Sequence, residues 1–191
     1  MNDIVLFNND GIQTDTGASI DRVHQEGLLH GSVRVYFLDT QNKKVALQLR
    51  SSSSFQYPLF WDATVGGHID VGDSPLTTAL KESEEEVGVD ILEENLEFYM
   101  QYEESIEVLR EDMHEGFDGV YKDNVINFVY VYTVDDANDL KLKVDHTEVS
   151  KITWVSLEDL EGVFARGILD TRKVVPGRIE QESLCGFLRR M

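Results

Sequence analysis

The sequence predicts an α/β fold, in which a mixed β-sheet lies between helices. Three observations carry this prediction. An acidic helix occupies residues 75–87, and strand-like segments come both before and after it. The segment 125–134 is apolar nearly throughout, as expected for a strand in the centre of a sheet. A further helix is expected late in the chain, at residues 157–166.

The segments before the acidic helix alternate between strands and polar turns. Residues 3–8 are apolar enough for a first strand. Residues 11–23 are polar with interspersed glycines, so we expect a connector there. Residues 32–38 and 45–50 have strand-like patterns and are separated by turn residues, which predicts a hairpin.

The segments after the acidic helix complete the expected fold. We expect strands at 96–105 and 152–155, a polar loop or hairpin excursion at 107–123, and a loop at 135–145. Ser156 is a suitable N-cap for the helix 157–166, and a last helix is expected at 179–190. The chain shows neither an internal repeat nor a low-complexity segment, so residues 1–191 are expected to form a single domain.

The acidic helix has clear start and stop signals. Ser74 offers an N-cap oxygen, Pro75 suits the first helical position, and Gly88 stands where helices commonly end. One face carries the stripe expected to be buried, which consists of Leu76, Ala79, Leu80, Ser83 and Val87. Three glutamates at i, i+3 and i+4 gather on another face, namely Glu82, Glu85 and Glu86.

This gathering of carboxylates is costly without a counterion. Two such charges about 5.5 Å apart repel each other by roughly 3 kcal/mol at an effective dielectric constant near 20. In a half-sheltered cleft the cluster should therefore raise some of its pKa values or bind a divalent cation. Oxygen ligands beside a glycine-rich loop suit Mg²⁺. The alternative is a solvated acidic helix face, which is common in a chain this acidic.

The stretch from Gly67 to Val89 resembles the Nudix box, G-x5-E-x7-R-E-U-x-E-E-x-G-U, where U is a bulky aliphatic residue. Gly67, Gly88, Val89 and the three helix glutamates fall in register over these 23 positions. Three positions depart from the pattern, because Asp73 replaces Glu, Lys81 replaces Arg and Ser83 replaces an aliphatic residue. The first two departures concern charges that support the metal ligands.

The resemblance implies a Nudix-type α/β/α sandwich and the hydrolysis of a diphosphate linkage by water, with Mg²⁺ or Mn²⁺ as the cofactor. It assigns the metal to Glu82, Glu85 and Glu86 and to the backbone carbonyl of Gly66. The general base is expected to be Glu85 or Glu148, and Glu148 could equally be an exposed loop carboxylate. Arg50 could hold a phosphate through its guanidinium or pair with a surface acid.

The flanking residues resemble the branch of the superfamily that includes isopentenyl-diphosphate isomerase. This resemblance is carried by Leu47-Gln-Leu-Arg-Ser51, Tyr57-Pro58, Trp61-Asp62 and Val65-Gly-Gly-His68. The isomerase has a catalytic Cys where this chain has Gly66, and a Glu near the position of Asn124. A hydrolase acting on a nucleoside diphosphate derivative or a similar organic diphosphate is therefore favoured. The alternatives are an isomerase-like enzyme and a non-catalytic nucleotide-binding module.

The isomerase resemblance also raises the question of a second metal site. Its counterpart of His68 binds metal together with two further histidines, for which His24 and His30 are the candidates here. Hydrogen-bonded structural histidines are the alternative, and the sequence leaves the choice open.

Composition limits the partners of the chain. The formal net charge is −19, which argues against non-specific binding to nucleic acid or to anionic membranes. One cysteine, Cys185, fits a reducing compartment, and no apolar stretch approaches 18 residues. We expect a cytoplasmic protein whose partner is a small-molecule diphosphate. Homodimers are frequent in the superfamily that this sequence resembles.

Overall fold

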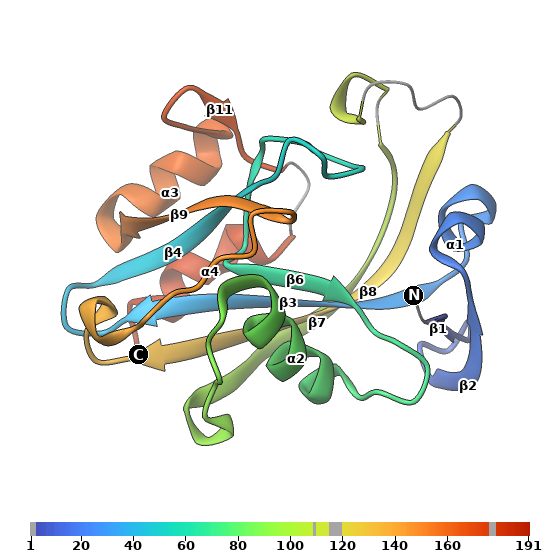
Figure 1. Cartoon of the computed structure of the whole chain (residues 1–191), viewed down its shortest axis with the longest axis horizontal. Helices are drawn as coiled ribbons and strands as arrows, with labels where there is room; N and C mark the ends of the chain where they lie inside the picture. The colour runs from blue at the N-terminus through green and yellow to red at the C-terminus, as the bar shows by residue number, and fades with distance from the viewer. Residues whose placement is uncertain (1–2, 109, 115–119, 176–178) are drawn as a thin grey trace.

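The computed structural model describes residues 3–108, 110–114, 120–175 and 179–191. A mixed sheet of nine strands lies between helices (Figure 1). At its centre β3 (His30–Asp39) pairs in parallel with β8 (Tyr121–Val134), from His30 opposite Val125 to Asp39 opposite Val134. The predicted α/β fold and the central position of the 125–134 strand are therefore confirmed.

The other strands extend this centre. They are β1 (Ile4–Phe7), β2 (Gln13–Ala18), β4 (Lys44–Arg50), β5 (Trp61–Asp62), β6 (Val65–His68), β7 (Leu96–Val108) and β9 (Val149–Ser156). A separate small hairpin consists of β10 (Ile168–Leu169) and β11 (Arg172–Lys173). The helices are α1 (Ile20–Glu26), α2 (Pro75–Val87), α3 (Leu157–Arg166) and α4 (Ile179–Leu188), with 3₁₀ turns η1 (Glu93–Asn95), η2 (Arg110–Asp112) and η3 (Ala137–Asp139).

One edge of β3 pairs with β8, and along its other edge the partner strand changes from β6 to β4. Its first half pairs with β6, from Ser32 to Val35, whereas β4 pairs with it only at Leu38 and Asp39. Strand β4 then turns away and pairs with β9 and β5. The sheet therefore splits between β6 and β4, as Figure 1 shows, and this split positions the candidate site.

Two hydrophobic clusters cover the two faces of the sheet. Helix α2 packs through Ala79 and Val87 against one face, which includes Val33 and Val35 of β3. Helices α3 and α4 pack against the other face, with Leu184 of α4 in the same cluster as Tyr36 of β3 and Val129 of β8. Among the described residues no helix is long and apolar enough to span a membrane.

The predicted helices and the first hairpin are confirmed, but the connector predicted at 11–23 is wrong. That segment contains the whole of β2 and the start of α1. Strand β2 is polar and largely exposed, so it lacks the apolar alternation from which strands are predicted, and its pairing with β1 fixes it. Helix α1 ends at Gly27, whose φ is 69°. Ser19 and Gly27 were the available sequence signals for this helix.

Two other predicted boundaries change. Strand β7 runs on to Val108 and β8 begins at Tyr121, so much of the predicted loop 107–123 belongs to a long hairpin. Residues 109 and 115–119 of that loop lie outside the described residues. Strand β9 is longer than the predicted 152–155, because pairing with β4 extends from Val149 to Ser156.

Helix α2 is closed at both ends in the expected way, and its C-terminus holds a loop in place. The Ser74 hydroxyl accepts a hydrogen bond from the Thr77 N–H at 3.0 Å. At the other end the N–H groups of Lys143 and Asp145 donate to the carbonyls of Val87 and Glu86, each at 2.8 Å. These bonds satisfy helix carbonyls that would otherwise lack a partner, and they tie the loop 143–148 to the acidic helix.

We predict that Gly88→Ala destabilises the protein by about 2 kcal/mol, because alanine disfavours the left-handed backbone. The φ of Gly88 is 68°, and an added β-carbon would lie 2.7 Å from the β-carbon of Lys143. The matched control is Gly186→Ala in α4, where the nearest atom would be 3.8 Å away and the change should be neutral or stabilising. Chemical denaturation measures both changes, and equal effects would contradict the prediction.

Candidate active site

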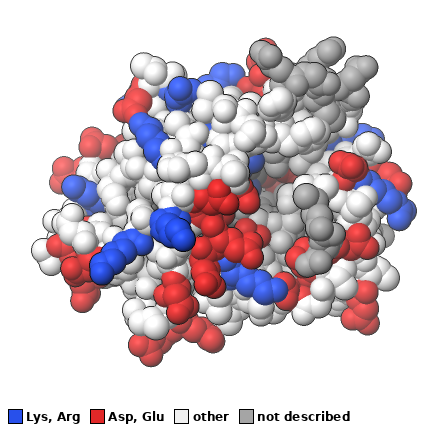
Figure 2. All heavy atoms as spheres, viewed as in Figure 1, with Lys and Arg blue, Asp and Glu red and all other residues white. Residues whose placement is uncertain are grey.

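A pocket of about 460 Å³ opens where the sheet splits. It is lined by residues of β3, β6 and β8, by α2, and by the loops 51–56 and 147–148. Figure 2 shows acidic side chains gathered in the middle of the face that carries α2 and the loop before β9. The predicted residues Arg50, Gly66, Gly67, Glu82, Glu85, Glu86 and Glu148 all line this pocket.

Glu86 is the most deeply placed carboxylate of the acidic helix. It is 4% exposed, although its spacing had suggested a face away from the buried stripe. Its Oε2 accepts hydrogen bonds from the Gly66 N–H at 3.1 Å and from the Gln48 side chain at 3.3 Å. The pKa of Glu86 is raised well above its ordinary value. Burial is the largest cause, and the negative charge of Glu82 is the next.

Glu82 lies against the backbone of β6. A β-carbon at position 67 would overlap the Glu82 carboxylate, so this approach requires Gly67. Burial raises the pKa of Glu82 to about 8, with further contributions from Glu148 and Glu85. Glu86, in the last turn of α2, also meets the negative end of the helix dipole, which makes its negative charge still less favourable.

Glu148 is brought to the acidic helix by the loop that α2 holds. Burial raises the pKa of Glu148, with Asp145 and Glu85 as further causes. Its backbone carbonyl accepts from the Ser51 N–H at 2.8 Å, which joins this loop to the 51–56 loop across the pocket. The two candidate bases, Glu85 and Glu148, therefore interact with each other.

The acidic side chains have not converged on a single point. Among the described residues the group of three metal-type ligands whose atoms all lie within 4.8 Å of one another consists of histidines, and it does not include the glutamates. Glu85 is exposed, so its side chain has the freedom to rotate toward the others.

Asp73 and Lys81, which replace a Glu and an Arg of the box, do meet. Lys81 Nζ lies 2.6 Å from Asp73 Oδ2. This hydrogen bond raises the pKa of Lys81, and the charges of Asp70 and Glu85 act in the same direction. The Lys81 side chain is 53% exposed, so the contact is partly screened by water. The box departures thus preserve an ion pair at this place.

Arg50 is held in the pocket by two contacts. Its Nε donates to the Gln56 carbonyl at 3.1 Å, and its Nη1 lies 3.7 Å from Asp62 Oδ2. Arg50 therefore pairs with an acid, which was one expectation. It also lines the pocket, where the other expectation, binding a phosphate, would place it.

The three histidines that the sequence singled out come together, and one of them, His68, lines the pocket. His24, His30 and His68 each contact the other two through their rings, with centroids 5.0–5.2 Å apart. Burial lowers the pKa of all three, and that of His24 falls to about 4. Neutral imidazoles carry a lone pair that can bind a metal.

The hydrogen bonds of two of these histidines orient their lone pairs. The Nδ1 atoms of His24 and His30 lie 3.2 and 3.0 Å from the carbonyls of Lys122 and Leu28. A carbonyl only accepts, so we assign the proton to Nδ1 and the lone pair to Nε2 in both rings. Both Nε2 atoms are buried and have no hydrogen-bond partner among the described residues. Asp123 lies 3.5 Å from His30 Nε2, without hydrogen-bond geometry.

Several residues of the pocket were missed from the sequence. These are Arg34, Asp62, Asp123 and Asn127. Gln48, which donates to Glu86 from outside the lining, was also missed. Position 124 itself carries no carboxylate, but the preceding residue Asp123 places one beside His24 and His30. The available signal was a polar residue within an otherwise apolar strand, as at Arg34 and Asn127.

Known proteins with similar sequences carry the same domain. The NUDIX domain family model matches residues 28–177. Nudix hydrolase 3 of Arabidopsis thaliana is 30% identical over 154 residues, which cover 79% of this chain and 19% of that protein. The isopentenyl-diphosphate Delta-isomerase of Serratia proteamaculans (strain 568) is 36% identical over 67 residues, which cover 35% of this chain and 37% of that enzyme. The chain thus spans less than two fifths of the length of either relative.

The fold is shared with a solved structure over nearly the whole chain. The crystal structure of DR0079 from Deinococcus radiodurans matches 98% of this chain and 97% of its own, with a TM-score of 0.60 and 18% identity. The family match includes the box glycine, the acidic helix and every strand from β4 to β9. The chain belongs to the NUDIX domain family.

Proposed function

We propose that this chain is a hydrolase that cleaves a diphosphate linkage in a small organic diphosphate, with a divalent cation bound by Glu82, Glu85 and Glu86. The observation that carries the proposal is that carboxylates of the acidic helix are buried without a positively charged partner in the described part of the chain. Among the described residues none of these carboxylates forms an ion pair with a lysine or arginine within 4.0 Å. Glu82 and Glu86 nevertheless lie in a sheltered pocket beside Glu148.

The donor set fits Mg²⁺ or Mn²⁺. Carboxylate oxygens are the ligands that these hard cations take, and the proposed carbonyl of Gly66 is a further oxygen. Burial and, after it, repulsion between carboxylates raise the pKa values of Glu82 and Glu86, and a bound cation would offset both costs. When bound, it would neutralise phosphate oxygens and lower the pKa of the attacking water.

The chain's own groups would orient the ligands and take up the proton. Hydrogen bonds from Gly66 and Gln48 hold the Glu86 carboxylate in one orientation. Glu148 is the favoured general base, because its raised pKa brings it nearer to neutral pH, where a base is most effective. Glu85 remains the alternative, since it lines the same pocket. Arg50 would bind a phosphate oxygen.

The isomerase alternative lacks a group at the reacting position. The residue before the box glycine is Gly66, which has no side chain with which to transfer a proton. The alternative of a non-catalytic module is disfavoured because all three box glutamates are present. Hydrolysis by water needs neither a cysteine nor a second carboxylate at these positions.

We also propose a transition metal at the histidine cluster. Two buried nitrogen lone pairs lack a partner among the described residues, and a third imidazole lies within 4.8 Å of them. Neutral imidazole suits Zn²⁺ and similar ions, and the Nδ1–carbonyl bonds are the usual outer contacts of metal-binding histidines.

The proposed hydrolysis is tested by a substrate screen with Mg²⁺ on organic diphosphates. We predict that EDTA abolishes turnover and that Glu85→Gln, Glu86→Gln and Glu148→Gln each lower kcat/KM by at least about a hundredfold. Loss of a metal ligand should raise the Mg²⁺ concentration needed for half-maximal rate. Loss of the base should instead leave that concentration unchanged and remove the fall in rate at low pH. Glu84→Gln, an exposed neighbour outside the pocket, is the control.

Turnover that persists in EDTA would contradict the metal assignment. Formation of dimethylallyl diphosphate from isopentenyl diphosphate would instead support the isomerase alternative.

The pKa of Glu82 predicts how stability depends on pH and Mg²⁺. Its pKa is about 8 in the folded chain against an ordinary 4.5, so the folded state binds more protons between these values. The contribution of Glu82 to stability therefore falls as pH rises from about 4.5 to 8. We expect Mg²⁺ to raise the melting temperature more at pH 8 than at pH 5, where protons compete with it. Glu82→Gln should reduce this difference, and an equal Mg²⁺ effect at both pH values would refute the prediction.

Metal analysis tests the histidine cluster without reference to activity. We predict about one equivalent of transition metal per chain by mass spectrometry after dialysis against Zn²⁺, or a visible absorption band after loading with Co²⁺. His30→Gln should abolish this binding. His146→Gln, at a histidine outside the cluster, should leave it unchanged. Equal binding by both variants would exclude the site.

A further inference from the structure

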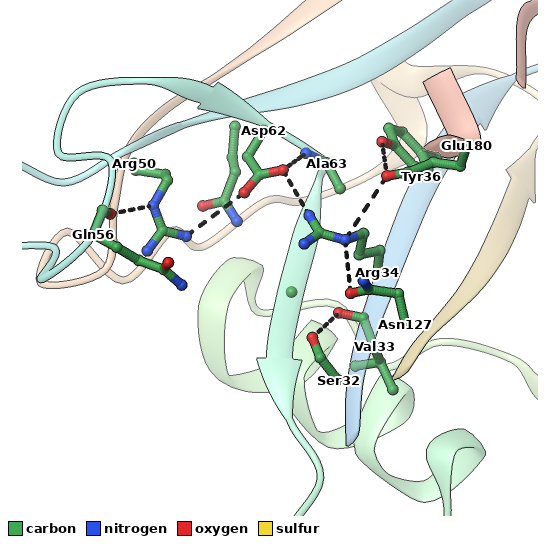
Figure 3. A network of polar contacts seen from close by, with 12 residues as sticks. Ser32, Val33, Arg34, Tyr36, Arg50, Gln56, Asp62, Ala63, Asn127 and Glu180 are labelled. Atoms are coloured by element: carbon green, nitrogen blue, oxygen red, sulfur yellow. Dashed lines mark hydrogen bonds and ion pairs between the residues drawn. The ribbon is translucent and has the colours of Figure 1, made fainter. Parts of the chain in front are cut away.

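Arg34 lies in the floor of the pocket and is compensated by two carboxylates (Figure 3). Its Nη1 donates to Asp62 Oδ1 at 3.0 Å, and its Nε lies 3.8 Å from Glu180 Oε1. Asp62 is shared with Arg50, and Tyr36 donates to Glu180. Arg34 is thus neutralised by Asp62 and Glu180, so its guanidinium adds no net attraction for a second phosphate beside the one assigned to Arg50.

Asn127 stands beside this network on the neighbouring strand. It is fully buried and pairs in register with Ser32, two residues before Arg34 on β3. In a parallel ladder these residues share one face of the sheet, and both Arg34 and Asn127 line the pocket.

The contact with Arg34 fixes the orientation of the Asn127 amide. Arg34 Nε donates to Asn127 Oδ1 at 3.2 Å. A guanidinium only donates, so the amide oxygen must face Arg34 and the Nδ2 group must face the other way. Within the described part of the chain Asn127 Nδ2 is buried and finds no acceptor. Buried donors of this kind are rare in folded proteins and are costly to leave unpaired.

We propose that Asn127 Nδ2 is a specificity-determining donor, which binds an uncharged acceptor on the non-phosphate part of the substrate. The balanced charges around Arg34 favour a carbonyl oxygen, a ring nitrogen or a hydroxyl over a second phosphate. A nucleoside carries such acceptors, whereas a prenyl chain carries none. The inference rests on the proposed function, and it selects nucleoside diphosphates over isoprenoid diphosphates.

The position of Asn127 relative to the acidic helix agrees with this role. Gly66 on β6 pairs with Arg34 on β3, and Asn127 lies on β8, the strand on the other side of β3. Asn127 is therefore separated from Gly66 by two strand spacings across the sheet and by two residues along the strand direction. Strand spacing and rise per residue place the two Cα atoms about 12 Å apart. A diphosphate held near Gly66 and Glu86 can therefore extend its organic group toward Asn127 within one pocket.

The test compares two kinds of terminal diphosphate with the full chain and Mg²⁺. ADP, GDP, CDP and UDP are measured against isopentenyl diphosphate, which has the same phosphate groups and no acceptor beyond them. We expect wild-type kcat/KM for at least one nucleotide to exceed that for isopentenyl diphosphate by about tenfold or more. An equal or reversed preference would overturn the inference.

The variant Asn127→Asp removes the donor and keeps an oxygen for Arg34. We expect it to raise KM for the preferred nucleotide about tenfold with little change in kcat. KM for isopentenyl diphosphate should change less than threefold, and that arm measures the repulsion added by the new charge. Asn127→Leu removes the donor without adding charge and should show the same selectivity. Asn95→Asp, the same change on an exposed residue outside the pocket, is the control.

Equal changes in KM for both substrate kinds would mean that Asn127 is structural, and the inference would fail while the hydrolase proposal stands. If no diphosphate is hydrolysed, the hydrolase proposal fails and calorimetry with the same compounds decides the inference. In that case the inference about Asn127 requires that Asn127→Asp binds the nucleotide at least tenfold more weakly than the wild-type chain, and unchanged binding would overturn it.

Discussion

The parallel pairing of β3 with β8 is the constraint on which the rest of the structure depends. Ten consecutive residue pairs, from His30–Val125 to Asp39–Val134, hold the two strands in one register. Since side chains alternate between faces, a slip of one residue would send Asn127 to the face under α2 and an apolar neighbour into the pocket. The register therefore fixes at once the packing of both cores and the set of polar groups that line the site.

Buried charges are compensated by partners at one end of the pocket and are not compensated at the other. Around Arg34 each charge has a partner within the chain, since Asp62 and Glu180 face the guanidinium. Around α2 the three glutamates Glu82, Glu85 and Glu86 lie near one another, and the described lysines and arginines form no ion pair with them within 4.0 Å. Burial and, after it, the charges of neighbouring carboxylates raise the pKa values of Glu82 and Glu86. The first end is electrostatically complete, whereas the carboxylates of the second have no compensating cation among the described residues.

The C-terminus of α2 links the acidic helix to the rest of the site. Its last carbonyls accept from the loop 143–148, and that loop carries Glu148 to the helix glutamates. The same loop bonds to Ser51, at the start of the loop that lines the opposite wall. A local requirement, the satisfaction of helix carbonyls, thus brings together residues that are more than sixty positions apart in sequence.

The sequence by itself determined the elements whose signals are local. The caps at Ser74 and Gly88, the spacing of the three glutamates, and the apolar run of β8 predicted the acidic helix and the central strand. It did not predict β2, because a polar edge strand such as Gln13–Ala18 is set by its partner and not by its own pattern. Only the tertiary structure decided that Glu86 is buried, that the three histidines converge, and that Asn127 turns an unpaired donor away from Arg34. Each of these depends on contacts between strands distant in sequence, whose register no local pattern specifies.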